Sequence, residues 1–134
     1  MVKIMARIEF DEYKVKLENM EPKLTALGES LGLESAREEL ERLHAMAASE
    51  GFWNDAANSQ KVTKQTRLLE TKIASFEKMC ADREDMLVLC EMAIEEDDDS
   101  MLSELEEGYA ALEQEMQRVA AEGLDEAVFR RSKK

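Results

Sequence analysis

The spacing of apolar side chains constrains this chain more than any other feature of its sequence. Over the first segment, these side chains recur in steps of three and four, which places them on one face of an α-helix as the a and d positions of a seam. A strand would instead bury every second residue. The seam residues are Phe10, Tyr13, Leu17, Met20, Leu24, Leu27 and Leu31.

Three later segments repeat this spacing. A helix over about residues 55–96 would be roughly 60 Å long, and a helix of that length needs packing partners. We expect helices over about residues 9–28 and 33–50 to cover its first half, and a helix over about residues 99–122 to cover its second. The seam of the longest helix is Val62, Thr66, Leu69, Ile73, Phe76, Cys80, Arg83, Leu87, Cys90 and Ile94. The seam of the helix expected over about residues 33–50 is Leu33, Ala36, Leu40, Leu43 and Ala47. The seam of the helix expected over about residues 99–122 is Leu102, Leu105, Tyr109, Leu112, Met116 and Val119.

An acidic connection, residues 95–100, joins the third and fourth expected helices. So short a connection makes the two helices antiparallel neighbours in an αα-hairpin. The run lacks the Asp-x-Asp/Asn-x-Asp/Asn-Gly spacing of a calcium-binding loop. We therefore expect Asp99 or Ser100 to cap the fourth helix, whose dipole the carboxylates complement.

The expected fold class is all-α. The chain is predicted to form a helical bundle of about four helices with a long antiparallel αα-hairpin and coiled-coil-like a/d seams. Residues 1–123 are expected to form a single domain. Residues 124–134, which include Arg130, Arg131, Lys133 and Lys134, are expected to form a basic, disordered tail.

Two glycine-containing joints separate the first three helices. The first joint, residues 28–32, is expected to end the first helix at Gly28. Ser35 and Glu38 have the spacing of a capping box for the second helix. Pro22 falls on the outer face of the first helix and should kink that helix without ending it.

The second joint, residues 51–55, contains the only Trp of the chain. Gly51 is expected to end the second helix in a left-handed conformation, and Asp55 to cap the third helix. Phe52 and Trp53 are interpreted as aromatic fillers of the corner between the helices. On that interpretation, Trp53→Ala would cost several kcal/mol of stability.

Charge argues against several classes of partner. The chain carries 18 Lys plus Arg against 31 Asp plus Glu, a net charge of −13, so its field repels a phosphate backbone and disfavours autonomous nucleic-acid binding.

No apolar run reaches the length of a membrane span and no signal peptide opens the chain, so a cytoplasmic location is expected. Cys80 and Cys90 would lie roughly 15 Å apart on one helix, so we expect buried, reduced thiols.

The sequence predicts no catalytic, cofactor-binding or metal-binding residues, and hence no enzyme. It contains no nucleophile elbow, phosphate-binding Gly-rich loop, Cys-x-x-Cys or His-Glu-x-x-His. His44, the only His, is expected near the end of the second helix, where its charge complements the helix dipole. A di-iron site inside the bundle is a disfavoured alternative, because Glu41 and His44 supply one Glu-x-x-His motif where two are needed.

One stretch resembles a known family. The segment Gly51-Phe52-Trp53-Asn54-Asp55, followed by Ser59-Gln60-Lys61-Val62, is similar to part of the N-terminal domain of the bacterial peptide chain release factor 2 family. Residues 27–34 resemble the first loop of that domain, and residues 87–99 resemble its second hairpin turn. Together the matching parts cover about residues 10–116.

The chain also departs from the family pattern. Gly32 stands where an Asp is expected, which leaves Ser35 to cap the second helix. Ala56 stands where a Pro is common at the first helical position. The chain contains neither Gly-Gly-Gln, which in the family reaches the peptidyl-transferase centre, nor Ser-Pro-Phe, which reads the stop codon.

The resemblance implies a non-catalytic N-terminal domain that positions a translation termination factor on the ribosome and needs no cofactor. The partners implied are the stalk-base and GTPase-associated region of the ribosome and the GTPase release factor. The alternative is a free-standing coiled-coil or helical-bundle adaptor, which would form a homodimer through a seam that the chain itself leaves uncovered.

Overall fold

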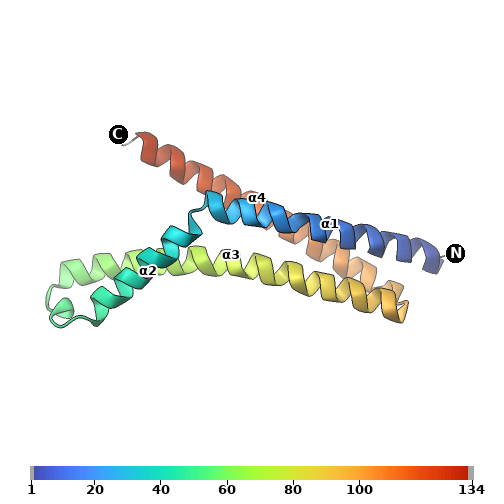
Figure 1. Ribbon diagram of the computed structural model, residues 1–134, viewed down its shortest axis with the longest axis horizontal. Helices are drawn as coiled ribbons and strands as arrows, with labels where there is room; N and C mark the ends of the chain where they lie inside the picture. The colour runs from blue at the N-terminus through green and yellow to red at the C-terminus, as the bar shows by residue number, and fades with distance from the viewer. Residues whose placement is uncertain (1, 133–134) are drawn as a thin grey trace. The chain divides into compact units, whose positions relative to one another are not determined.

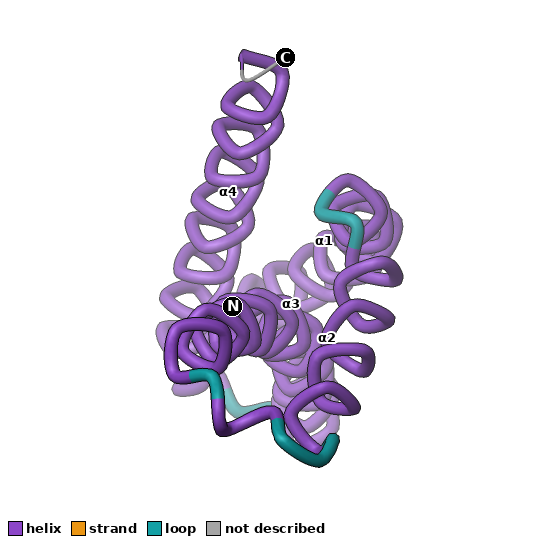
Figure 2. The backbone as a smooth tube through the Cα atoms, turned by 90° about the vertical axis from the view of Figure 1, so that its left-hand side faces the viewer, coloured by secondary structure: helices purple, strands orange, loops and turns teal. Residues whose placement is uncertain are grey.

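The computed structural model describes the backbone of residues 2–132 and the side chains of residues 7–123. Every element of that part is helical, which confirms the all-α prediction (Figure 1). Short connections between the helices form the loops (Figure 2). The elements are α1 (Val2–Ser30), α2 (Leu33–Ala48), η1 (Phe52–Asn54), α3 (Ala56–Glu96), η2 (Asp99–Met101) and α4 (Leu102–Ser132).

The ends of the chain are more helical than the sequence analysis indicated. α1 begins at Val2, before the expected start at about residue 9, and continues unbroken through Pro22. α4 continues to Ser132, so the described part of the expected disordered tail, residues 124–132, is helical. Good helix formers and the absence of Gly or Pro after Gly123 account for this continuation. Residues 133–134 lie outside the described part.

The chain divides into two compact units where a single domain was expected. Unit 1 contains the chain up to Leu27 and again from Met79 onward, and unit 2 is Gly28–Lys78. α2 has 16 residues and α3 has 41, so α2 can cover only the part of α3 in its own unit. The expectation that the first helix covers the first half of α3 is wrong, because most of α1 shares a unit with the second half.

Unit 1 is held together by the seams of α1, α3 and α4. The chain reverses direction at η2, as expected for an αα-hairpin (Figure 1). The rings of Tyr13 and Tyr109 meet edge to face at 5.4 Å, with the Lys16 ammonium 4.9 Å from the Tyr13 ring centre. The buried side chains are Phe10, Leu17, Met20, Leu24, Leu27, Met79, Arg83, Cys90, Ala93, Leu105, Leu112 and Val119.

Arg83 is the charged member of this core. Its Nε donates to the backbone carbonyl of Leu17 at 2.6 Å, and its guanidinium lies 3.5 Å from the carboxylate of Glu21. Both partners lie on α1 within one turn or so of Pro22, which cannot donate to the carbonyl of Glu18. The guanidinium thus ties α3 to the backbone of α1 one residue before Glu18.

Unit 2 packs α2 against the first part of α3. Its central cluster consists of Leu43, Phe52 and Val62, flanked by half-buried Met46, Ala47 and Leu69. Gly28 lies inside the last turns of α1 and does not end that helix as expected. A Cβ at Gly28 would stand 2.9 Å from the Phe76 ring, so glycine permits this close approach.

The helix ends of unit 2 follow the expected chemistry with two exceptions, at Gly51 and Ser35. The Asp55 carboxylate accepts from the amide of Asn58 at 3.1 Å, which confirms Asp55 as the cap of α3. Gly51 adopts the predicted left-handed conformation, with a φ of 83°, but the prediction that it ends α2 is wrong. α2 ends at Ala48, its C-cap Ser49 is extended, and Gly51 precedes η1. The predicted capping role of Ser35 is wrong. α2 begins after Gly32, which adopts a φ of 64° and offers no side-chain cap.

In the hairpin turn of unit 1, the capping residue is Asp98, the residue before the expected Asp99 or Ser100. The Asp98 carboxylate accepts from the amide of Ser100 at 3.0 Å, where Asp99 or Ser100 was expected to act as the cap. The Ser100 hydrogen bonds lower the pKa of Asp98. Asp97 ends α3 in a left-handed conformation, and the amide of Asp98 donates to the carbonyl of Ala93. The acidic residues thus serve as helix ends.

Candidate functional site

Two adjacent aromatic side chains at the α2–α3 joint have different environments. Phe52 is 7% exposed and belongs to the core of unit 2, as predicted, whereas Trp53 is 64% exposed. The interpretation of Trp53 as a corner filler is therefore wrong. Successive side chains of the 3₁₀ turn η1 point about 120° apart, so two neighbours cannot both face the core.

Trp53 is nevertheless held in place. Its indole Nε1 donates to the backbone carbonyl of Ala47 at 3.2 Å. Its ring meets Phe52 edge to face, with 4.9 Å between centroids and 88° between planes. The exposed ring is thus presented in a fixed orientation at the surface of unit 2.

A shallow groove of ≈ 430 Å³ runs beside Trp53 along the first part of α3. We call it the Trp53 groove. Two rows of α3 residues four apart border it, the row Gln60, Lys64 and Leu68 and the row Ser59, Thr63, Arg67 and Thr71. Trp53 lies with these rows in the lining.

The Trp53 groove carries positive charge on a strongly acidic chain. Residues 56–69 contain Lys61, Lys64 and Arg67 and no Asp or Glu, while the whole chain has a net charge of −13. None of the three cations forms an ion pair with a residue whose side chain the structure describes. The sequence analysis missed this site. A run without acid in such a chain is the signal that would have identified it.

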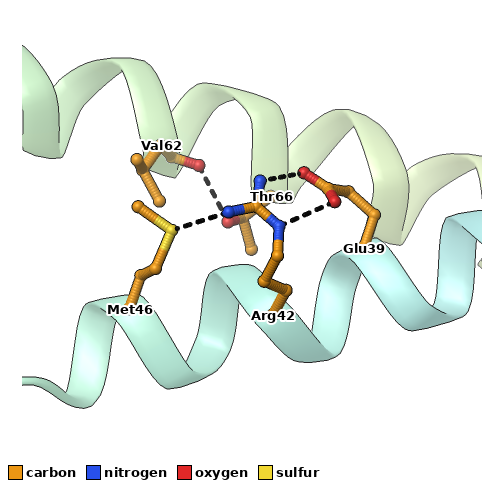
Figure 3. Close-up of polar contacts among 5 residues, drawn as sticks. All are labelled: Glu39, Arg42, Met46, Val62 and Thr66. Atoms are coloured by element: carbon orange, nitrogen blue, oxygen red, sulfur yellow. Dashed lines mark hydrogen bonds and ion pairs between the residues drawn. The ribbon is translucent and has the colours of Figure 1, made fainter.

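A second set of polar contacts lies within α2 and within the facing part of α3. Arg42 holds Glu39 through two hydrogen bonds and contacts the sulfur of Met46 at 3.3 Å, next to Thr66, which donates to the Val62 carbonyl (Figure 3). The hydrogen bond and charge of Arg42 lower the pKa of Glu39. All of these contacts have a structural role at the surface.

His44 of α2 contacts α3. Its Nε2 lies 3.3 Å from the Glu70 carboxylate, and its side chain is exposed. Among the described residues, no three His, Cys, Asp or Glu side chains gather as a metal site would require. Glu41 therefore has no partners in this part of the chain from which a di-iron site could be built.

The two cysteines lie in α3 without a disulfide bond. Cys90 is fully buried, and burial raises the pKa of its thiol to about 11. Cys80 is half-buried. None of the described helices combines the length and the apolar character needed to cross a lipid bilayer.

Comparison with known proteins gives one consistent result. Residues 36–129 match the model of the PCRF domain, and the Trp53 groove lies within that stretch. Peptide chain release factor 2 of Lactiplantibacillus plantarum is 31% identical over 111 residues, which is 83% of the chain and 29% of that protein. Peptide chain release factor 2 of Rickettsia bellii is 36% identical over 69% of the chain and 24% of its own length.

The relative from Acidothermus cellulolyticus, also a peptide chain release factor 2, is 32% identical over 72% of the chain and 26% of its own length. The chain thus spans less than a third of the length of the curated relatives it matches. No solved structure matches the chain.

Proposed function

The chain belongs to the family of proteins that carry a PCRF domain, and from that premise we propose that it is the N-terminal, non-catalytic domain of a release-factor-2-like translation termination protein. Its role would be to position the factor on the ribosome in the cytoplasm. The observation that carries the proposal is the match of residues 36–129, together with three release factor 2 relatives that are at least 31% identical.

The residues support a positioning role over a catalytic one. The sequence contains neither Gly-Gly-Gln nor Ser-Pro-Phe, so neither peptide release nor stop-codon reading has residues here to perform it. The helical units provide exposed surfaces for docking, and the Trp53 groove is one of them. By resemblance, the docking partners are the stalk-base and GTPase-associated region of the ribosome and the GTPase release factor.

The proposal is tested by binding and by activity on the same ribosomes. We expect the purified chain to co-sediment with ribosomes programmed with a stop codon, and full-length release factor 2 to displace it. We also expect it to release no peptide from those ribosomes, on which full-length factor serves as the positive control. Failure to co-sediment would contradict the positioning role, and release by this chain alone would contradict the non-catalytic role.

A dimeric adaptor is the second candidate, and exposed apolar side chains favour it. Ile8 and Val15 of α1 are 52% and 54% exposed and line a shallow hollow with Asp11, Glu12 and Lys16. Ile8 and Val15 are seven residues apart and therefore share one face of α1, the spacing through which a second helix would pack. Light scattering tests this second candidate, because an adaptor of this kind requires twice the monomer mass and a strict monomer would contradict it.

A further inference from the structure

We propose that the Trp53 groove binds an acidic amphipathic helix of a partner protein. The helix would insert an apolar side chain between Trp53 and Leu68 and place carboxylates against Lys64 and Arg67. This inference goes beyond the proposed function, which counts the groove among the docking surfaces but does not say which kind of segment binds in it. The inference is argued from the residues of unit 2 alone. The peptide-binding experiment below can therefore contradict it without contradicting the proposed binding to ribosomes, and the reverse also holds.

The shape of the groove matches a helix. Rows of side chains four residues apart form ridges on an α-helix, and the hollow between two such ridges accepts a ridge of another helix. Lys64 and Leu68 lie on one row and Thr63 and Arg67 on the other. Because both rows come from the single helix α3, their spacing is fixed before any partner binds.

Trp53 supplies an anchor that is ordered in advance. Binding usually costs free energy because mobile side chains must be fixed, and the hydrogen bond to Ala47 and the contact with Phe52 already fix this ring. Tryptophan and arginine are also the residue types that most often dominate the binding energy of protein interfaces. Trp53 and Arg67 combine both in one hollow.

The positive charge of Lys64 and Arg67 favours an acidic ligand, and the apolar residues of the lining favour a protein segment over a nucleic acid. Lys64 and Arg67 have no ion pairs with described side chains, so carboxylates can reach them without displacing an internal partner. The surface of the groove is mostly apolar, with Leu68 and Trp53 in its lining, which matches an apolar side chain. A polyanionic RNA would experience the repulsion of the −13 chain along its length, whereas a short acidic helix experiences less of it.

The single Trp of the chain makes its fluorescence a reporter of this groove. The probe is a synthetic peptide of about 18 residues without Trp or Tyr, helical in design, with Leu along one face and Glu on both flanks. We expect it to shift Trp53 emission to shorter wavelength with saturation. The same peptide with Lys in place of Glu should produce no shift. No shift with the acidic peptide, or equal shifts with both, overturns the proposal, as does a saturable shift with oligouridylate alone.

Two variants with equal charge change locate the site. Arg67→Glu is expected to weaken binding of the acidic peptide at least about tenfold, because an attractive contact becomes a repulsive one. Lys23→Glu, on the exposed surface of α1 in unit 1, changes the net charge equally and should leave the affinity within about twofold. Circular dichroism establishes that both variants keep the helical fold. Equal weakening by the two variants, or none by Arg67→Glu, overturns the proposal.

Discussion

At the scale of single residues, Phe52 and Trp53 are neighbours whose truncation should have different consequences. Phe52→Ala empties a site in the core cluster of unit 2 and is expected to cost about 3–5 kcal/mol of unfolding free energy. Trp53→Ala removes a largely exposed ring and one hydrogen bond, so its cost should stay near or below about 1 kcal/mol. Urea denaturation of both variants measures the difference, and equal losses would contradict the assignment of core and surface.

The raised pKa of the buried Cys90 thiol should make the free energy of unfolding depend on pH. Burial raises its pKa from the ordinary 9.0 to about 11, so the unfolded chain ionises this thiol more readily than the folded one. The stabilisation is complete below pH 9 and is lost as the pH rises towards 11. Cys90→Ala, which lacks the thiol, should therefore lose less unfolding free energy than the parent chain between pH 8 and pH 10. Parallel pH profiles for the two proteins would contradict a buried, neutral Cys90.

At the scale of elements, Arg83 links α3 to α1 within unit 1. Arg83→Lys keeps the charge but loses the planar Nε donor to the Leu17 carbonyl, so we expect a loss of about 1–3 kcal/mol. Glu21→Gln is the matched control, because the Glu21 side chain is 72% exposed and lies 3.5 Å from the guanidinium. Chemical denaturation of both variants should show a clear loss for Arg83→Lys and almost none for Glu21→Gln. The reverse order would show that the ion pair, and not the carbonyl contact, holds the two helices.

The seams show how far spacing alone predicts the packing of elements. In α1, Phe10, Leu17 and Met20 are buried as predicted, because one face of that helix meets the core of its unit. In α3 the pattern fails locally: Met79 and Ala93 are buried although neither is a predicted seam residue. A helix that passes from one unit into another meets new partners, so its buried face widens or turns. Periodicity carries no information about that change of partners.

Hydrophobic spacing could not have predicted the Trp53 groove. Spacing identifies residues that face a core, and most of the residues that line the Trp53 groove, such as Trp53, Lys64 and Leu68, are exposed. The exposure of Trp53 depends on which of two adjacent aromatics the turn η1 points inward, and the sequence is compatible with either. The cap at Asp55 and the left-handed conformation of Gly51 were predictable, because each requires particular residue types at one position. The end of α2 at Ala48, before Gly51, was not.

At the scale of the whole molecule, the net charge of −13 predicts that added salt stabilises the fold. Raising the ionic strength from about 0.01 M to about 0.1 M shortens the Debye length from about 30 Å to about 10 Å, which weakens repulsion among carboxylates spread over the surface. The opposing effect is small, because the ion pairs of Arg118 with Glu115 and Glu122 are exposed and contribute little. The melting temperature measured by circular dichroism should therefore rise with NaCl. MgCl₂ at equal ionic strength should produce the same rise if screening is the cause, whereas a much larger rise would indicate binding of the cation to the acidic surface.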